Sequence, residues 1–116
     1  MTFEPGAELS ADEARQRVDE TIENSEIALF MKGSPMMPQC GYSRKALALI
    51  QHHREEVATV DVLEALPAYR EALARHSDRE TIPQVFVDGE FVGGSDILEQ
   101  LHERGELAAT LNAETA

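Results

Sequence analysis

Residues 27–31 form a short run of apolar side chains, IALFM, between two polar segments. A run of this length without alternation is typical of a strand that is buried on both faces of a sheet. A loop and a helical pattern from residue 41 to about residue 54 follow it, and a second β-rich run, ATVDV, begins at residue 58. This order predicts two parallel strands joined by a right-handed crossover through a helix.

The other patterns along the chain also alternate between helix and strand. Ser10 and Glu13 form a capping box, which marks the start of an amphipathic helix. The dipeptide Asp88-Gly89 separates two β-rich runs and predicts a two-residue hairpin turn. The expected elements are helices at 10–25, 41 to about 54 and 67–76, strands at 27–31 and 58–62, a hairpin at 83–94, a helix at 95–105 capped by Ser95, and a last helix at 106–112.

This order of elements predicts an α/β fold of the thioredoxin-like class, with a four-stranded mixed sheet flanked by helices. A chain of 116 residues has the length of one ordinary domain. We expect that domain to span residues 10–111, after a flexible N-terminal leader at 1–9 and before a C-terminal tail at 112–116.

Charge and cysteine content exclude several classes of protein. The formal net charge of −12 disfavours nucleic-acid binding, which needs clustered lysines and arginines. The chain has no apolar stretch of about 18 residues, so we expect no membrane span, and its first residues lack the pattern of a secretory signal. A single cysteine argues against a disulfide-built secreted domain, so we expect a cytoplasmic protein.

Cys40, the only cysteine, stands between a loop rich in proline and glycine and a predicted helix. The free N–H groups and partial positive charge of a helix N-terminus stabilise a thiolate, as do cations such as Lys32, Arg44 and Lys45. This placement predicts a nucleophile or a metal ligand, and the alternative is a small buried hydrophobic residue. Ser43 takes the place of a second thiol in CGYS, which excludes an intramolecular dithiol cycle.

The stretches MKGSPMMPQCGYSRKAL and TIPQVFVDGEFVGGSDIL, together with the order of the elements, resemble a monothiol glutaredoxin of the CGFS type in the thioredoxin-like superfamily. The resemblance covers residues 22–107, so the domain at 10–111 resembles a single glutaredoxin domain. The sequence departs from the family at three places: Tyr42 replaces a phenylalanine, Ser95 replaces a cysteine, and Arg79-Glu80 replaces Trp-Pro.

The resemblance implies a glutathione groove and a 2Fe–2S cluster shared by two subunits. Lys32 and Arg70 match positions that pair with a glutathione carboxylate. The implied groove residues are Lys32, Cys40, Tyr42, Arg70, Ile82, Pro83, Gly94, Ser95 and Asp96, and Cys40 is also the implied catalytic residue and cluster ligand. Such a cluster takes four thiolate ligands, which two chains and two glutathiones would supply together.

Two segments of the implied groove would hold the ligand backbone to backbone. Ile82 matches a position whose backbone pairs with the cysteinyl part of glutathione and which precedes a cis proline. The sequence alone predicts that the peptide bond before Pro83 is trans, because only about 5–6% of X-Pro bonds are cis. Gly94 permits close approach of the backbone. Ser95 and Asp96 open a helix whose N–H groups can hold the γ-glutamyl carboxylate, while Asp96 can accept from its ammonium group.

The sequence leaves three functions open. The first is an iron–sulfur carrier that passes its cluster to apo-proteins, as a homodimer or as a heterodimer with another assembly factor. The second is a weak glutathione-dependent oxidoreductase in which Cys40 attacks glutathionylated thiols, and the third is a regulatory binding module that bears a cluster. Either glutathione or a related γ-glutamyl thiol can serve as the co-ligand in these hypotheses.

Overall fold

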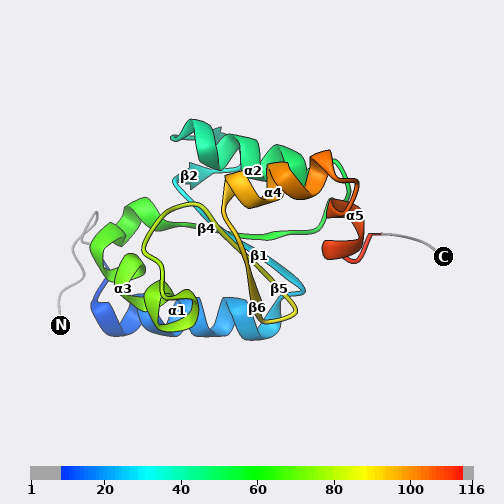
Figure 1. Cartoon of the computed structure of the whole chain (residues 1–116). Helices are drawn as coiled ribbons and strands as arrows, with labels where there is room; N and C mark the ends of the chain where they lie inside the picture. The colour runs from blue at the N-terminus through cyan, green and yellow to red at the C-terminus, as the bar shows by residue number, and fades with distance from the viewer. Residues whose placement is uncertain (1–8, 114–116) are drawn as a thin grey trace.

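A computed structural model describes residues 9–113 and shows one central sheet between two layers of helices (Figure 1). The strands of the sheet lie in the order β4-β1-β5-β6, in which β1 is parallel to β4 and antiparallel to β5. Its strands are β1 (Ile27–Met31), β4 (Ala58–Asp61), β5 (Gln84–Val87) and β6 (Glu90–Gly93). The predicted four-stranded mixed sheet and its parallel β-α-β unit are confirmed.

The helices cover both faces of this sheet. Their bounds are α1 (Ala11–Asn24), α2 (Gly41–Gln51), η1 (Val62–Ala65, a 3-10 helix), α3 (Leu66–Ser77), α4 (Ser95–Glu103) and α5 (Leu107–Thr110). Figure 1 shows α1 and α3 on one face and α2 and α4 on the other, with α5 beside α4. The layered α/β arrangement thus matches the fold expected from the sequence.

β1 supplies side chains to both halves of the hydrophobic core. Ala28 and Phe30 pack with α1 and α3, whereas Ile27, Leu29 and Met31 pack with α2 and α4. Successive side chains of a strand point to opposite faces, so an uninterrupted apolar run suits a strand that is covered twice. All five residues of β1 are buried, which confirms the interpretation of this run.

Several predicted boundaries are wrong by a few residues. α2 ends at Gln51 and not near residue 54, because the N–H groups of His53 and Arg54 turn back onto the carbonyl of Ile50. β4 ends at Asp61, whose carboxylate accepts from the Leu63 N–H and begins the 3-10 helix. These two ends depend on local turns that no glycine marks in the sequence.

The caps of the helices were predicted with mixed success. The Ser10–Glu13 capping box is present at α1, with both reciprocal hydrogen bonds at 3.1 Å. Ser95, expected to cap α4, is instead the first residue of that helix, and the N-cap is Gly94, which has no side chain to donate or accept. The first N–H groups of α4 therefore stay free of a side-chain cap.

The loop predicted at residues 33–39 contains a small antiparallel hairpin of β2 (Gly33–Ser34) and β3 (Met37–Pro38). Gly33 has φ +92°, a conformation that side chains other than glycine rarely adopt. Its N–H donates to the Asp61 carboxylate at 2.9 Å, and the Gln39 N–H donates to the Lys32 carbonyl at 2.9 Å. The segment that leads to Cys40 is thereby fixed to the end of the sheet.

A network of polar side chains closes the other end of the sheet, where β1 begins. The Arg54 guanidinium donates to the Glu26 carboxylate, with a shortest contact of 2.6 Å, and to the Leu111 carbonyl at 2.9 Å. The Asn112 amide donates to the carboxylates of Glu26 and Asp88 at 3.1 and 2.8 Å. We refer to these side chains of Glu26, Arg54, Asp88 and Asn112 as the polar network.

The ends of the chain lie partly outside the described residues. The predicted leader at 1–9 falls outside them except for Leu9, which packs against the α1–α3 half of the core. Of the predicted tail at 112–116, only residues 112 and 113 are described. Among the described residues, no helix has the length and apolar character needed to cross a membrane.

Candidate functional site

Cys40 is the N-cap residue of α2 and is half-buried at the carboxyl end of β1, beyond the small hairpin. Its backbone is extended, with φ −147° and ψ 132°, and its side chain makes no capping hydrogen bond. Ser43, one turn later, is fully buried, and its hydroxyl accepts from the Lys32 N–H at 3.0 Å. This hydroxyl therefore links α2 to the end of β1.

The surroundings of the thiol favour its ionised form. Burial by itself raises the pKa of Cys40, because a thiolate loses hydration there. The N–H groups of Ser43 and Tyr42, the Ser43 hydroxyl and the charge of Lys32 act in the opposite direction. Together they outweigh burial and hold the pKa of Cys40 below the usual value of a thiol, which is the property of a nucleophilic or metal-binding cysteine.

We expect Lys32→Gln to raise the pKa of Cys40, because it removes the one cation that stabilises the thiolate through its charge. The measurement is the pH profile of alkylation by iodoacetamide, whose midpoint should move to higher pH. Lys45→Gln is the matched control, because Lys45 pairs with Glu99 of α4 and not with the thiol. Equal profiles for the Lys32 variant and the unchanged protein would contradict the role of Lys32.

The predicted positive patch around the thiol is only partly present. Lys32 acts on Cys40, but Arg44 and Lys45 are not among the groups that shift its pKa. Lys45 forms an ion pair with Glu99 that links α2 to α4 on the surface of the molecule. Of the three cations expected beside the thiol, one therefore stabilises the thiolate.

A groove of about 510 Å³ lies between the loop before β5 and the start of α4. Its lining residues are Tyr42, Arg79, Thr81, Ile82, Pro83, Phe91, Val92, Gly93, Gly94, Ser95, Asp96 and Ile97. Tyr42 follows Cys40 by two positions, so the groove begins within one helical turn of the thiol. The groove and the thiol therefore share the first turn of α2.

Close packing of the backbone shapes the floor of the groove. The Ile82–Pro83 peptide bond is cis, as the resemblance implied and as the sequence alone did not predict. A Cβ atom on Gly94 would come within 3.0 Å of the Pro83 carbonyl oxygen, and Gly93 has φ +152° with Ile97 against it. These two glycines allow β6 to turn into α4 directly over the proline.

The groove brings together six of the nine residues predicted for the site: Tyr42, Ile82, Pro83, Gly94, Ser95 and Asp96. Cys40 and Lys32 are not among the lining residues, although the charge of Lys32 acts on the thiol. Arg70 is half-buried on α3 and is not among the lining residues, so the groove does not include it. The roles assigned to these residues remain predictions.

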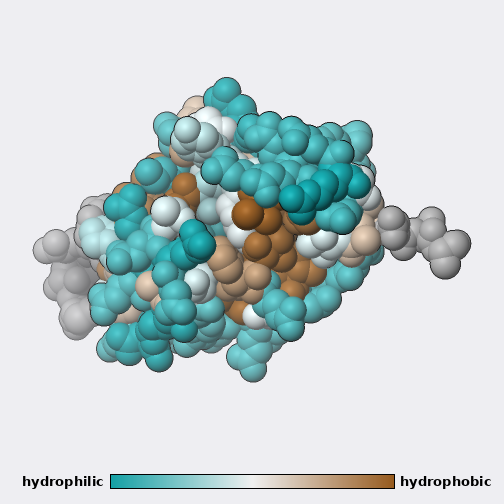
Figure 2. Space-filling model, viewed as in Figure 1, coloured by the Kyte–Doolittle hydropathy of each residue, from teal (hydrophilic) through white to brown (hydrophobic). Residues whose placement is uncertain are grey.

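Sequence reasoning missed one charged residue and one wall of the groove. Arg79 lines the groove, although it was noted only as a departure from the family's Trp-Pro. Phe91, Val92 and Ile97 add an apolar wall, and Figure 2 shows the hydrophobic patch beside β6 and below α4, bordered by hydrophilic residues. The place of Arg79 in the groove depends on β6 and α4, which are distant from it in sequence.

Histidines gather at the far ends of α2 and α4. His52, His53 and His102 have ring centroids 4.9 to 6.4 Å apart, and burial followed by the neighbouring imidazoles lowers the pKa of His53. Within residues 9–113, no three histidine, cysteine or carboxylate side chains are arranged to hold a metal ion. A cluster bound through Cys40 would therefore need ligands from outside this part of the chain.

Comparison with known proteins agrees with this geometry. The sequence profile of the family described as Glutaredoxin matches residues 27–92. The chain is 41% identical over 97 residues to the uncharacterized monothiol glutaredoxin ycf64 of Porphyra purpurea, which covers 84% of this chain and 90% of the relative. It is 39% identical over 104 residues to a ycf64-like monothiol glutaredoxin of Synechocystis sp., and this alignment covers 90% of this chain and 96% of the relative.

Solved structures show the same fold. The solution structure of reduced poplar apo GrxS14 superposes with a TM-score of 0.73 at 32% identity and covers 84% of this chain and 89% of that one. This similarity confirms the predicted thioredoxin-like fold. With one cysteine at the start of α2 and monothiol relatives over most of its length, the chain belongs to the glutaredoxin family as a monothiol member.

Proposed function

We propose that this monothiol glutaredoxin carries a 2Fe–2S cluster, bound jointly by two subunits and two molecules of glutathione or a related γ-glutamyl thiol, and passes it to apo-proteins. The observation that carries the proposal is the position of Cys40. The pKa of the Cys40 thiol is lowered, and a groove begins in the same helical turn. The buried hydroxyl of Ser43 stands where a dithiol enzyme needs a second cysteine.

The donor set of the chain fits a shared cluster. A cluster of this kind takes four thiolates, and each chain has one cysteine. Two Cys40 thiolates and two thiols held in the grooves complete the set, and a soft thiolate is the preferred ligand of such iron. The cluster is the cargo of the protein in this proposal, so its binding and release constitute the function.

The groove residues would hold the co-ligand thiol beside Cys40. The Ile82 backbone, next to the cis proline, is available to pair with the cysteinyl part of the thiol. The uncapped N–H groups at the start of α4 suit a carboxylate, and the exposed carboxylate of Asp96 suits an ammonium group. Lys32 acts on the thiolate of Cys40 and can also meet a carboxylate of the ligand.

A second candidate function follows from the lowered pKa of Cys40. The thiolate could attack the glutathione sulfur of a glutathionylated protein, which forms a Cys40–glutathione disulfide and releases the protein thiol. A second glutathione thiolate would then attack that disulfide, which frees Cys40 and gives glutathione disulfide. This is a glutathione-dependent oxidoreductase reaction, and it needs no iron.

One experiment separates the two functions. The apo-protein is reconstituted with iron and sulfide without oxygen, with and without glutathione, and the product is mixed with an apo-ferredoxin. The carrier should turn brown only with glutathione, become a dimer by size measurement, and transfer its cluster. Efficient turnover of a glutathionylated protein by a chain that forms no cluster would favour the oxidoreductase instead.

The proposal includes the partners and the compartment. They are apo iron–sulfur proteins and either a second copy of this chain or another assembly factor, rather than nucleic acid or a membrane surface. The net charge of −12 supports the exclusion of nucleic acid. We place the protein in the cytoplasm, because a thiolate-ligated cluster depends on reduced thiols, and that compartment keeps them reduced.

A further inference from the structure

The groove contains two charged lining residues of opposite sign, Arg79 and Asp96. Arg79 enters from the loop between α3 and β5, and Asp96 enters from the first turn of α4. Both side chains are exposed, and they do not form an ion pair with each other within 4.0 Å. A groove with a separate cation and anion suits a ligand that itself carries both charges.

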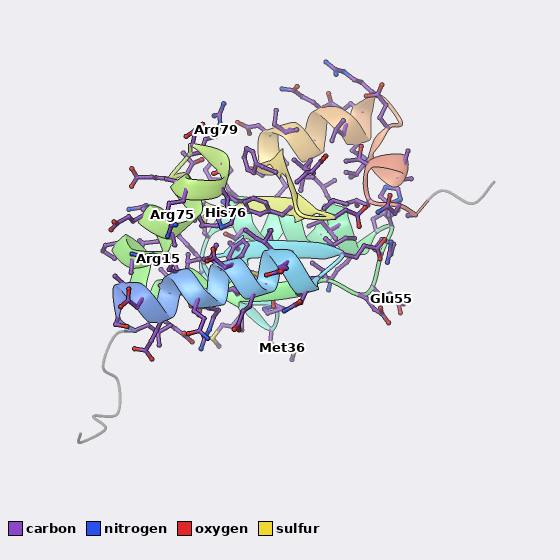
Figure 3. All side chains as sticks on the ribbon, turned by 90° about the horizontal axis from the view of Figure 1, so that it is seen from below. Arg15, Met36, Glu55, Arg75, His76 and Arg79 are labelled. Atoms are coloured by element: carbon purple, nitrogen blue, oxygen red, sulfur yellow. The ribbon has the colours of Figure 1, made fainter. Side chains whose placement is uncertain are left out.

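The guanidinium of Arg79 has no carboxylate partner among residues 9–113, and of the arginines without one it is the one that lines the groove. In a chain with 22 acidic residues, an arginine without a partner is available to an anionic ligand. Figure 3 shows Arg79 beyond the end of α3 on the side of α4, whereas Arg75 lies nearer to α1. Arg79 is thus the cation that reaches this groove.

The backbone of Arg79 is fixed by a buried hydrogen-bond network. The Gln84 amide, in a fully buried side chain, donates to the carbonyls of Arg79 and Thr81 at 2.7 and 3.0 Å. The Ser77 hydroxyl donates to the side-chain carbonyl oxygen of Gln84 at 2.8 Å and accepts from the Arg79 N–H at 3.1 Å. A segment held in this way presents the arginine side chain from a constant position, which reduces the entropy lost on binding.

We propose that Arg79 is a specificity-determining residue that binds the α-carboxylate of a γ-glutamyl thiol, opposite Asp96, which binds its α-ammonium group. The free end of a γ-glutamyl group is an α-amino acid, so it carries one negative and one positive charge close together. Arg79 and Asp96 complement these charges, and the free N–H groups at the start of α4 add donors for the carboxylate. The inference rests on the proposed function, because it names the ligand chemistry of that site.

This assignment separates the two ends of the ligand. Arg79 and Asp96 line the groove, whereas Lys32 and Arg70, which match positions that pair with a glutathione carboxylate, do not line it. Glutathione and γ-glutamylcysteine share the γ-glutamyl end and differ at the glycine. Arg79 should therefore contribute equally to the binding of both thiols.

The test uses the equilibrium between the apo-protein and the symmetric disulfides of four thiols. The Cys40 thiolate attacks one sulfur, forms a mixed disulfide and expels the other half as a thiol, and mass spectrometry gives the equilibrium constant. The thiols are glutathione, glutaryl-cysteinylglycine, which lacks the α-ammonium group, and 4-aminobutanoyl-cysteinylglycine, which lacks the α-carboxylate. γ-Glutamylcysteine is the fourth probe and lacks only the glycine.

Arg79→Gln should lower the constant about tenfold for glutathione, γ-glutamylcysteine and the glutaryl thiol, and leave the 4-aminobutanoyl thiol unchanged, since it removes a charge-assisted contact to a carboxylate. Asp96→Asn should lower the constant for the probes that carry the ammonium group. Arg75→Gln, a change of the same type at an arginine outside the groove, should have no effect.

The role of Arg79 would be overturned if Arg79→Gln lowered the equilibrium constant equally for all four probes, or for none of them. It would also be overturned if the constant fell for glutathione but not for γ-glutamylcysteine. These results would leave the proposed function intact as long as glutathione still forms the mixed disulfide and supports cluster binding. If the unchanged protein forms no mixed disulfide and builds its cluster without glutathione, both the function and the inference fail.

Discussion

Cys40→Ser should abolish cluster binding completely and leave the apo-protein folded. The thiolate is the one soft ligand that the chain supplies, and a serine hydroxyl is neither soft nor ionised at neutral pH. Because serine is a favoured N-cap residue and Cys40 makes no capping bond, the variant should even gain about 1 kcal/mol of stability. The visible absorption after anaerobic reconstitution and the midpoint of thermal unfolding measure the two effects.

Cys40→Ala is the matched control for that pair of measurements. It should lose the cluster to the same extent, but without the added stability, because alanine cannot cap a helix. Charge-transfer absorption of normal intensity in either variant would show that Cys40 is not a ligand. A large loss of stability in both variants would show instead that the thiol has a structural role in the core.

Gly33→Ala should destabilise the protein by about 2–5 kcal/mol, since the conformation and the space at this position both exclude a side chain. The φ of +92° is unfavourable for alanine, and a Cβ atom would lie 2.5 Å from the Met37 carbonyl oxygen and 2.6 Å from the Gln39 nitrogen. Both neighbours are backbone atoms of the hairpin that leads to Cys40. Chemical denaturation measures the loss, and cluster yield should fall with it because the approach to the thiol is displaced.

Gly41→Ala provides the comparison for Gly33→Ala. Gly41 follows Cys40 directly and opens α2, and a Cβ atom built on it meets no atom within 4 Å. Alanine there should change the free energy of unfolding by less than about 1 kcal/mol, in the stabilising direction. If both alanine variants behaved alike, the strain expected at Gly33 would be absent.

Features of the fold that depend on neighbours in sequence could be predicted. The capping box of Ser10 and Glu13, the buried strand β1 and the turn at Asp88-Gly89 each have a signature within a few consecutive residues of the sequence. The lone cysteine before a helix also followed directly from the sequence. Local patterns were sufficient because the residue types of each segment agree with the structure that the whole fold imposes on it, as the apolar run of β1 agrees with burial between two layers of helices.

Features that depend on contacts between distant segments could not be predicted. The hydrogen bond between the Ser43 hydroxyl and the Lys32 N–H, and the approach of Arg79 to β6 and α4, form only once the sheet is assembled. The gathering of His102 with the two histidines that follow α2 has the same origin. Arg79 in the groove was missed for this reason, since nothing near it in sequence indicates where its side chain lies.

The polar network lies at the end of the sheet where β1 begins, whereas Cys40 lies beyond the end where β1 finishes. It joins the residue before β1, the approach to β4, the turn after β5 and the C-terminal residues of the described chain. Amide hydrogens of β1, which is buried throughout, should exchange with solvent only when the whole molecule opens, whereas those of the β2–β3 hairpin should exchange through small local openings. The protein can therefore admit and release a ligand at one end of its sheet while the other end keeps the fold closed.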